Sequence, residues 1–209
     1  DTINPDGIGF ALLADSGALN NDGVSNLGTI SVTGLDSDTT WEYSTNGGTT
    51  WLAGNGNTFT LAAGDYAIGS IKVRQTDDAG NVNTSAGNAT LITIDQDAPV
   101  APVVAVITDV QNAAYAAGFS VTAGAVVTLT GADLNDFIKT TEDNLDIYTA
   151  KLNEFAGTES ITVVASFTDN AGNTSSTTLG LPEIDTINPD GIGFALLADS
   201  GALNNDGVS

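Results

Sequence analysis

An internal repeat is the feature that most constrains this chain. Residues 1–25, DTINPDGIGFALLADSGALNNDGVS, recur without a change as residues 185–209, at an offset of 184 residues. A weaker repeat at half that offset relates VRQTDDAGNVN (73–83) to ASFTDNAGNTS (165–175). A chain with such a period is an array of domains, in which each domain contacts mainly its neighbours in the sequence.

The repeated phrases divide the chain into two domains and the start of a third. IDQDAP (94–99) resembles IDTINP (184–189), so both phrases are interpreted as joints between domains. We therefore expect domain 1 at residues 1–94, domain 2 at residues 95–184 and an incomplete third domain at residues 185–209. A domain of about 90 residues is large enough for one small hydrophobic core.

Strand signals fill both domains. Short apolar or alternating runs are interrupted by Gly, Asn and Asp, and no segment has the period of a long amphipathic helix. Asn46-Gly47-Gly48 indicates a tight hairpin turn. The predicted strands of domain 1 lie at about 8–14, 28–34, 40–45, 50–53, 57–61, 66–76 and 87–94. Those of domain 2 lie at about 103–108, 125–131, 136–140, 147–152 and 161–169, and the acidic stretch 141–146 is predicted to be a loop or a short helical turn.

This spacing predicts an all-β fold, made of tandem immunoglobulin-like Greek-key β-sandwich domains that are joined by short linkers. In such a sandwich the last hairpin turn lies at the end where the chain enters the domain. The turn 168–173 and the loop 132–136 of domain 2 should therefore lie beside the linker 95–99. Three loops of domain 1 should face them, at residues 14–17, 20–23 and 63–66.

Composition excludes several classes of function. The chain has no Cys and no His, which excludes disulfides, thiol catalysis, Ser–His–Asp triads and His-based metal sites. Its 26 Asp plus Glu against four Lys plus Arg give a formal net charge of −22, so neither nucleic acid nor an anionic membrane is an expected partner. No apolar run is long enough to predict a membrane-spanning helix. The carboxylates recur in turns and not across a cleft, so no enzymatic activity is expected.

The predicted junction brings acidic residues of two domains and a linker together. Carboxylates at close range repel one another, and Ca²⁺, which binds oxygen ligands from Asp, Asn, backbone carbonyls and water, would replace this repulsion by attraction. The first-choice ligands are Asp95, Asp97 and Asp169. The second-choice ligands are Asp15, Asp22, Asp65 and Asp136, and the repeat adds Asp1, Asp77 and Asp185 at equivalent junctions.

Simpler interpretations of the same residues stay open. Asp-x-Ala-Gly-Asn is typical of a turn in which Asn bonds the backbone and Gly supplies a positive φ. The acidic surface can also serve solubility alone. Trp41 is expected in the core, whereas Trp51 offers a stacking surface for a glycan as an alternative function. A surface-layer or filament subunit is a third alternative, which requires contacts between separate chains.

Several phrases resemble the bacterial immunoglobulin-like repeats of giant surface adhesins. The resemblance is carried by TWEYSTNGGTTW (40–51), VTGL (32–35) and VRQTDDAGN (73–81), with LADSG (13–17) and the linker IDQDAPVAP (94–102) in support. Such repeats occur in biofilm-associated and RTX-type adhesins, which Gram-negative bacteria export by type 1 secretion. Domain 2 shares only the linker and the TDNAGN segment with this pattern.

The resemblance implies that these domains are extender repeats on the outside of the cell. They would hold a ligand-binding domain, located elsewhere in the parent protein, away from the cell surface for adhesion and biofilm formation. Ca²⁺ at the junctions would stiffen the stalk. The expected partners are neighbouring repeats of the same chain, so the resemblance implies a monomeric rod.

Overall fold

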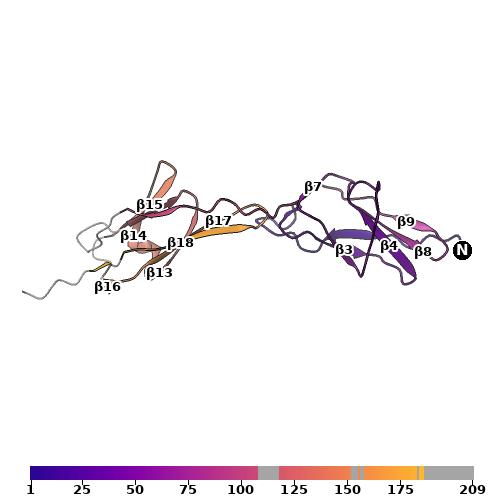
Figure 1. Cartoon of the computed structure of the whole chain (residues 1–209), viewed down its shortest axis with the longest axis horizontal. Coiled ribbons are helices and arrows are strands. Elements are labelled where there is room, and N and C mark those ends of the chain that lie inside the picture. Colours follow the sequence, from indigo (N-terminus) through magenta and orange to yellow (C-terminus); the bar gives the residue numbers. More distant parts are fainter. Residues whose placement is uncertain (108–117, 152–154, 156–157, 183, 186–209) are drawn as a thin grey trace, which may run out of the picture.

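A computed structural model describes residues 1–107, 118–151, 155, 158–182 and 184–185 of the chain. Two β-sheet domains follow one another along an elongated rod, with the N-terminus at one end (Figure 1). The predicted all-β class is confirmed, because the described residues form strands and a single one-turn 3₁₀ helix. The immunoglobulin-like order of the strands stays a prediction.

Domain 1 is built from three small sheets. Their orders are β1-β3-β6, β5-β4-β8-β9 and β2-β10-β7, and all neighbours pair antiparallel except β2 and β10, which run parallel. The strands are β1 (Gly9–Leu12), β2 (Val24–Ser25), β3 (Thr29–Thr33), β4 (Thr39–Ser44), β5 (Leu52–Ala53), β6 (Thr58–Thr60), β7 (Gly64–Tyr66), β8 (Lys72–Asp77), β9 (Val82–Thr84) and β10 (Ile92–Ile94).

The core of domain 1 lies between β3 and β6 on one side and β4 and β8 on the other. Ile30 and Val32 of β3 alternate with more exposed neighbours and contact the same cluster as Val73 of β8. Trp41 of β4 belongs to this cluster and is only 8% exposed, so its predicted place in the core is confirmed. The backbone of Gly54 lies directly on its indole ring, where a Cβ would come within 2.0 Å.

Domain 2 has a second, separate core. Its described sheets have the orders β11-β12-β15-β14, β13-β17-β18 and β16-β19. The rings of Phe119 and Tyr148 stack at 4.8 Å within this core. The elements are β11 (Val104–Val106), β12 (Gly118–Thr122), β13 (Val126–Thr130), the 3₁₀ helix η1 (Leu134–Asp136), β14 (Phe137–Glu142), β15 (Leu145–Ala150), β16 (Thr158–Glu159), β17 (Thr162–Thr168), β18 (Thr174–Gly180) and β19 (Ile184–Asp185).

One buried side chain explains two errors in the predicted strands of domain 1. The predicted strand 66–76 is interrupted between β7 and β8, and only the end of the predicted strand 87–94 forms β10. Asn88 is 6% exposed and replaces a strand partner here. Its Oδ1 accepts from the Ile71 N–H at 2.9 Å, and its Nδ2 donates to the carbonyls of Tyr66, Ala67 and Thr90.

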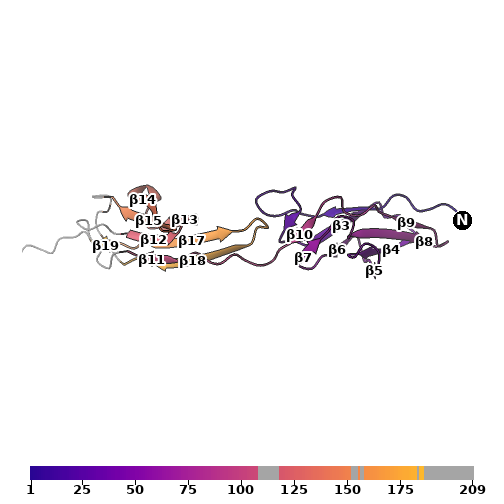
Figure 2. The same cartoon turned by 90° about the horizontal axis from the view of Figure 1, so that it is seen from above.

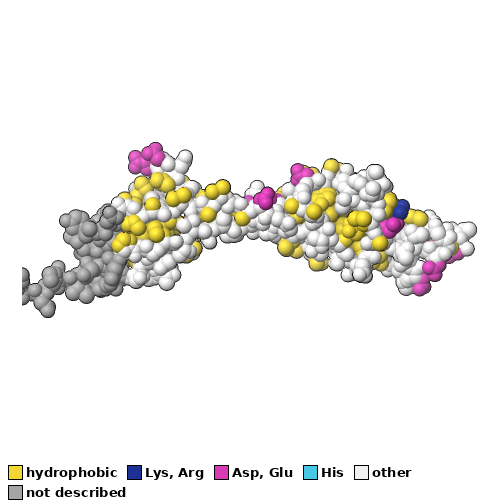
Figure 3. Space-filling view, in the orientation of Figure 1, with side chains coloured by type: hydrophobic (Ala, Val, Ile, Leu, Met, Phe, Trp, Pro, Cys, Tyr) yellow, Lys and Arg dark blue, Asp and Glu magenta, His cyan; other side chains and the backbone are white. Residues whose placement is uncertain are grey.

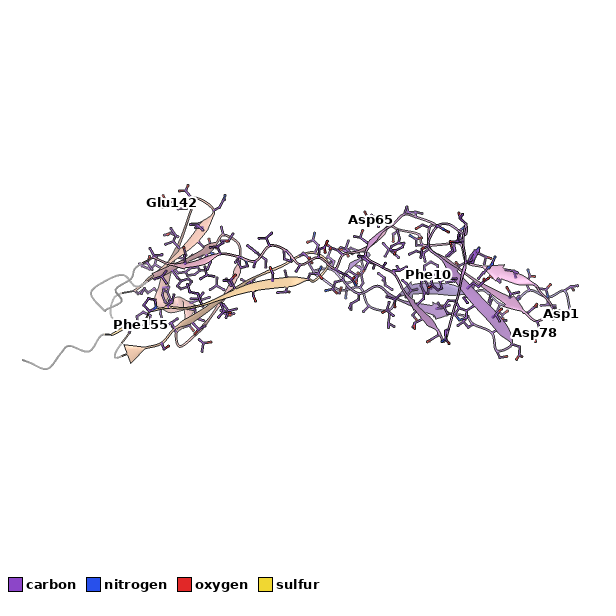
Figure 4. The ribbon with its side chains drawn as sticks, viewed as in Figure 1. Asp1, Phe10, Asp65, Asp78, Glu142 and Phe155 are labelled. Carbon is purple, nitrogen blue, oxygen red and sulfur yellow. The ribbon has the colours of Figure 1, made fainter. Side chains whose placement is uncertain are left out.

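The prediction of a loop or helical turn at 141–146 is wrong, because these residues form the tip of the β14–β15 hairpin. Asp143 and Asn144 have φ angles of 50° and 62°, the left-handed geometry of a two-residue hairpin turn. Asp146 is 2% exposed and pairs with Lys139 at 2.9 Å. The hairpin stands away from the body of domain 2, with Glu142 at its tip (Figure 4).

Gln75 of β8 fastens the N-terminal segment to domain 1. Its side chain is fully buried. The Nε2 group donates to the carbonyls of Asp6 and Gly34 at 2.8 and 2.9 Å. Oε1 accepts from the Asp36 N–H and from the Thr39 hydroxyl at 3.0 and 3.1 Å. All polar groups of this buried amide are thereby satisfied.

Replacing Gln75 by Ala should lower the free energy of unfolding of domain 1 by about 2–4 kcal/mol, because it opens a cavity and leaves several polar groups unpaired. Both tryptophans of the chain, Trp41 and Trp51, lie in domain 1, so tryptophan fluorescence during chemical denaturation follows this domain. The exposed Gln96 supplies the control, since Gln96→Ala should change the stability by less than about 0.5 kcal/mol. Equal midpoints for the two variants would contradict the role assigned to Gln75.

Candidate functional site: the junction between the domains

The linker between the domains is attached at both of its ends. It begins directly after β10, where the Asp95 N–H donates to the carbonyl of Ser25 at 3.0 Å. At its other end Pro102 is fully buried, and its carbonyl accepts from the hydroxyl of Thr177 in β18. β11 follows at once. The linker therefore has little length over which the domains could move apart.

A turn of domain 2 is seated on the end of domain 1. It connects β17 to β18, whose hairpin reaches toward domain 1 (Figure 2). Ala171 in this turn is 1% exposed. Its carbonyl accepts from the Asn26 N–H at 3.1 Å and from the Ser16 hydroxyl at 2.9 Å. Asn173 Nδ2 donates to the Asp95 carbonyl at 2.9 Å, so the predicted position of this turn beside the linker is confirmed.

Asp169 gives the turn its shape. Its Oδ1 accepts from the Asn173 N–H, and its Oδ2 accepts from Asn173 Nδ2, both at 2.9 Å. Gly172 supplies a φ of +96°. The hydrogen bond from the Asn173 side chain is the main reason why the pKa of Asp169 lies below its ordinary value. This arrangement matches the simple interpretation of Asp-x-Ala-Gly-Asn as a turn.

The receiving loop of domain 1 is organised around Ser25, which is fully buried. The Ser25 hydroxyl accepts from the Ser16 N–H at 3.2 Å and lies 2.9 Å from the Ser16 hydroxyl. Ser16 in turn lies 2.7 Å from Asn26 Oδ1. Asp15 closes the loop by accepting from the Gly23 N–H at 2.9 Å, and its Oδ1 is buried without a hydrogen-bond partner.

Two glycines let the backbones of the domains touch. Gly17 has a φ of +108°, and a Cβ there would come within 2.0 Å of the Asn170 carbonyl oxygen. On the other side a Cβ on Gly172 would lie 3.1 Å from the Gly17 nitrogen. No side chain fits between these segments, so the loop of domain 1 and the turn of domain 2 form one packed unit.

Most of the predicted Ca²⁺ ligands bind a nearby donor and do not converge. The carboxylate of Asp95 accepts from the Asp97 N–H, that of Asp22 from the Val24 N–H, and that of Asp65 from the Thr93 hydroxyl. The carboxylate of Asp1 accepts from the Ile3 N–H, and that of Asp77 accepts from both nitrogens of Asn81. Within the described part of the chain no three carboxylates lie close enough to hold a metal ion. The acidic residues at the junction therefore act first as turn formers.

Other predicted ligands lie away from this junction. The loop 132–136 is at the opposite end of domain 2, because β13 ends where Thr130 pairs with Thr162, far from Thr168 along β17. Its predicted position beside the linker is wrong, and Asp136 instead accepts from the Asp133 N–H at 2.8 Å. Asp185 lies in β19, and Asp1 and Asp77 lie at the N-terminal end of domain 1.

As arranged, these residues do not fit a Ca²⁺ ion. The ion takes six to eight oxygen ligands, whereas among the described residues no three carboxylates come together. Asp15 Oδ1 is a buried oxygen without a hydrogen-bond partner. Acidic side chains are visible at the junction, at the tip of the β14–β15 hairpin and at the N-terminal end of domain 1 (Figure 3), but they are spread over these separate places.

One face of the Trp51 ring is covered by a charged side chain. The guanidinium of Arg74 lies 4.2 Å from the centre of its ring. Glu42 holds Arg74 in this position through an ion pair of 2.6 Å. A sugar that stacked on this face would first have to displace a charged, paired side chain.

The chain matches no protein-family model and no curated protein sequence. No helix among the described residues is long and apolar enough to cross a membrane.

Replacing Asn173 by Ala should raise the pKa of Asp169 toward its ordinary value, because the hydrogen bond that chiefly lowers it is removed. The folded pKa of Asp169 is lowered, so the stabilisation from its carboxylate is complete above the unfolded pKa and is lost as the pH falls through the folded value. NMR titration of the Asp carboxyl carbons measures this directly. Asp77, which has the same bonds to Asn81, is the internal control and should keep its lowered pKa.

Proposed function

We propose that this chain is a section of the stalk of a bacterial surface adhesin, in which tandem β-sandwich domains act as stiff spacers outside the cell. The observation that carries the proposal is the junction, where the Ala171 carbonyl receives hydrogen bonds from two groups of the preceding domain. A spacer transmits length only if its joints resist bending, and this joint combines a short linker with direct backbone packing.

The sequence supports the same proposal. The repeat of residues 1–25 indicates that the pattern of domains continues, and a repeating chain of this kind gains reach with each added domain. A net charge of −22 keeps such a stalk soluble and keeps neighbouring stalks apart. The phrases that resemble adhesin repeats support a position at the surface of a Gram-negative bacterium, with the ligand-binding domain elsewhere in the parent protein.

Direct contacts, and not an ion, carry the stiffness in this proposal. Among the described residues no three carboxylates come together at the junction, so we expect the rod to keep its length without the ion. Small-angle scattering in Ca²⁺ and in chelator tests this expectation through the maximum dimension of the particle. A dimension that falls in chelator, together with calorimetric binding of Ca²⁺, would show that the ion holds the joint after all.

Replacing Gly17 by Ala should open the joint, because the new Cβ would overlap the Asn170 carbonyl. We expect a broader distribution of particle dimensions in small-angle scattering, with both domains still folded by circular dichroism. Gly56→Ala is the matched control, since Gly56 also has a positive φ, of 64°, but a Cβ there meets nothing within 4 Å. The stalk proposal fails if the wild-type chain already scatters as two freely hinged domains.

A further inference from the structure

Domain 1 carries a turn of the same construction as the turn that is seated at the junction. Asp77 bonds both nitrogens of Asn81 at 2.8 Å, as Asp169 bonds those of Asn173. The backbone bonds are also equivalent, with Asp77 N–H donating to the Asn81 carbonyl at 3.1 Å and Asp169 N–H donating to the Asn173 carbonyl at 3.0 Å. Gly80 has a φ of +87°, against +96° for Gly172.

The two turns differ in what covers them. Ala171 is 1% exposed because domain 1 lies on it, whereas Ala79, its counterpart, is exposed. Gly80 is exposed as well, and Val82 next to the turn is 42% exposed. The turn lies at the N-terminal end of the rod, where Asp1 and Asp78 are found together (Figure 4). Its shape is complete, so no partner is needed to form it.

We infer that the Asp77–Asn81 turn is a preformed docking element, which seats on the far end of a preceding domain of the kind formed by residues 95–184. The inference rests on the proposed stalk function and extends it from the observed junction to the other kind of junction in the array. Ala79 would offer its carbonyl to donors of the preceding domain, as Ala171 does, and Gly80 would allow the backbones to touch.

The repeat identifies the partner. Residues 185–209 copy residues 1–25 and follow domain 2 directly. A domain of the first kind is therefore preceded by a domain of the second kind wherever the pattern continues. The linker phrase is also repeated, since Asp185 to Pro189 copies Asp1 to Pro5.

A chain of three complete domains tests the inference, made by continuing residues 1–209 with residues 26–94. The chain has no Cys, so spin labels can be placed without background at Thr178→Cys in domain 2 and at the copy of Thr58→Cys in the third domain. Both threonines are exposed. We expect pulsed electron resonance to give one narrow distance peak across this second junction. Labels at Thr58→Cys in domain 1 and at Thr178→Cys in domain 2 measure the distance across the first junction in the same way.

Ala79→Arg supplies the matched comparison, because the same substitution can be made in two places. In the third domain it should abolish the narrow peak across the second junction, as Ala171→Arg should do across the first. In the first domain, which has no domain before it in this chain, it should leave both peaks unchanged. A narrow first peak with a broad second peak in the unsubstituted chain would overturn the inference and leave the stalk proposal standing. Two broad peaks would contradict both the inference and the stalk proposal. A narrow second peak that survives Ala79→Arg in the third domain would show that the turn does not form the joint.

Discussion

The arrangement of the two domains depends on one contact, in which the Ala171 carbonyl of domain 2 lies against the end of domain 1. This carbonyl accepts from the Asn26 N–H and the Ser16 hydroxyl, and Ser25 holds Ser16 from a fully buried site. Each bond is modest by itself. Because they act where the backbones touch at Gly17, they fix an orientation that a short linker alone would leave variable.

Several acidic residues of this protein have a structural role, which the net charge alone does not indicate. Asp77 and Asp169 each accept from both nitrogens of an Asn four residues later, and Asp146 is buried against Thr141 and Lys139. Each of these carboxylates therefore shapes its own turn, and among the described residues no three carboxylates come together.

Much of the fold could be predicted because it depends on local patterns. Alternation located β3, β4, β13 and β17 to within a few residues, and the expected course of the chain through a sandwich placed the Asp169–Asn173 turn at the joint. The errors have tertiary causes. The interruption between β7 and β8 depends on Asn88, whose partners lie on other segments, and β18 was missed because TSSTTLG has no apolar alternation and is held by its pairing with β17.

The sequence by itself determined the all-β class, the repeating organisation and the residues that shape each turn, because these follow from periodicity and from the short reach of Asp, Asn and Gly. Only the tertiary structure decided which turns meet. β13 runs antiparallel to β17, and this direction carries Asp136 to the far end of domain 2 while it leaves Asp169 at the joint. The direction of a strand within its sheet is set by pairing between distant segments, which no local pattern records.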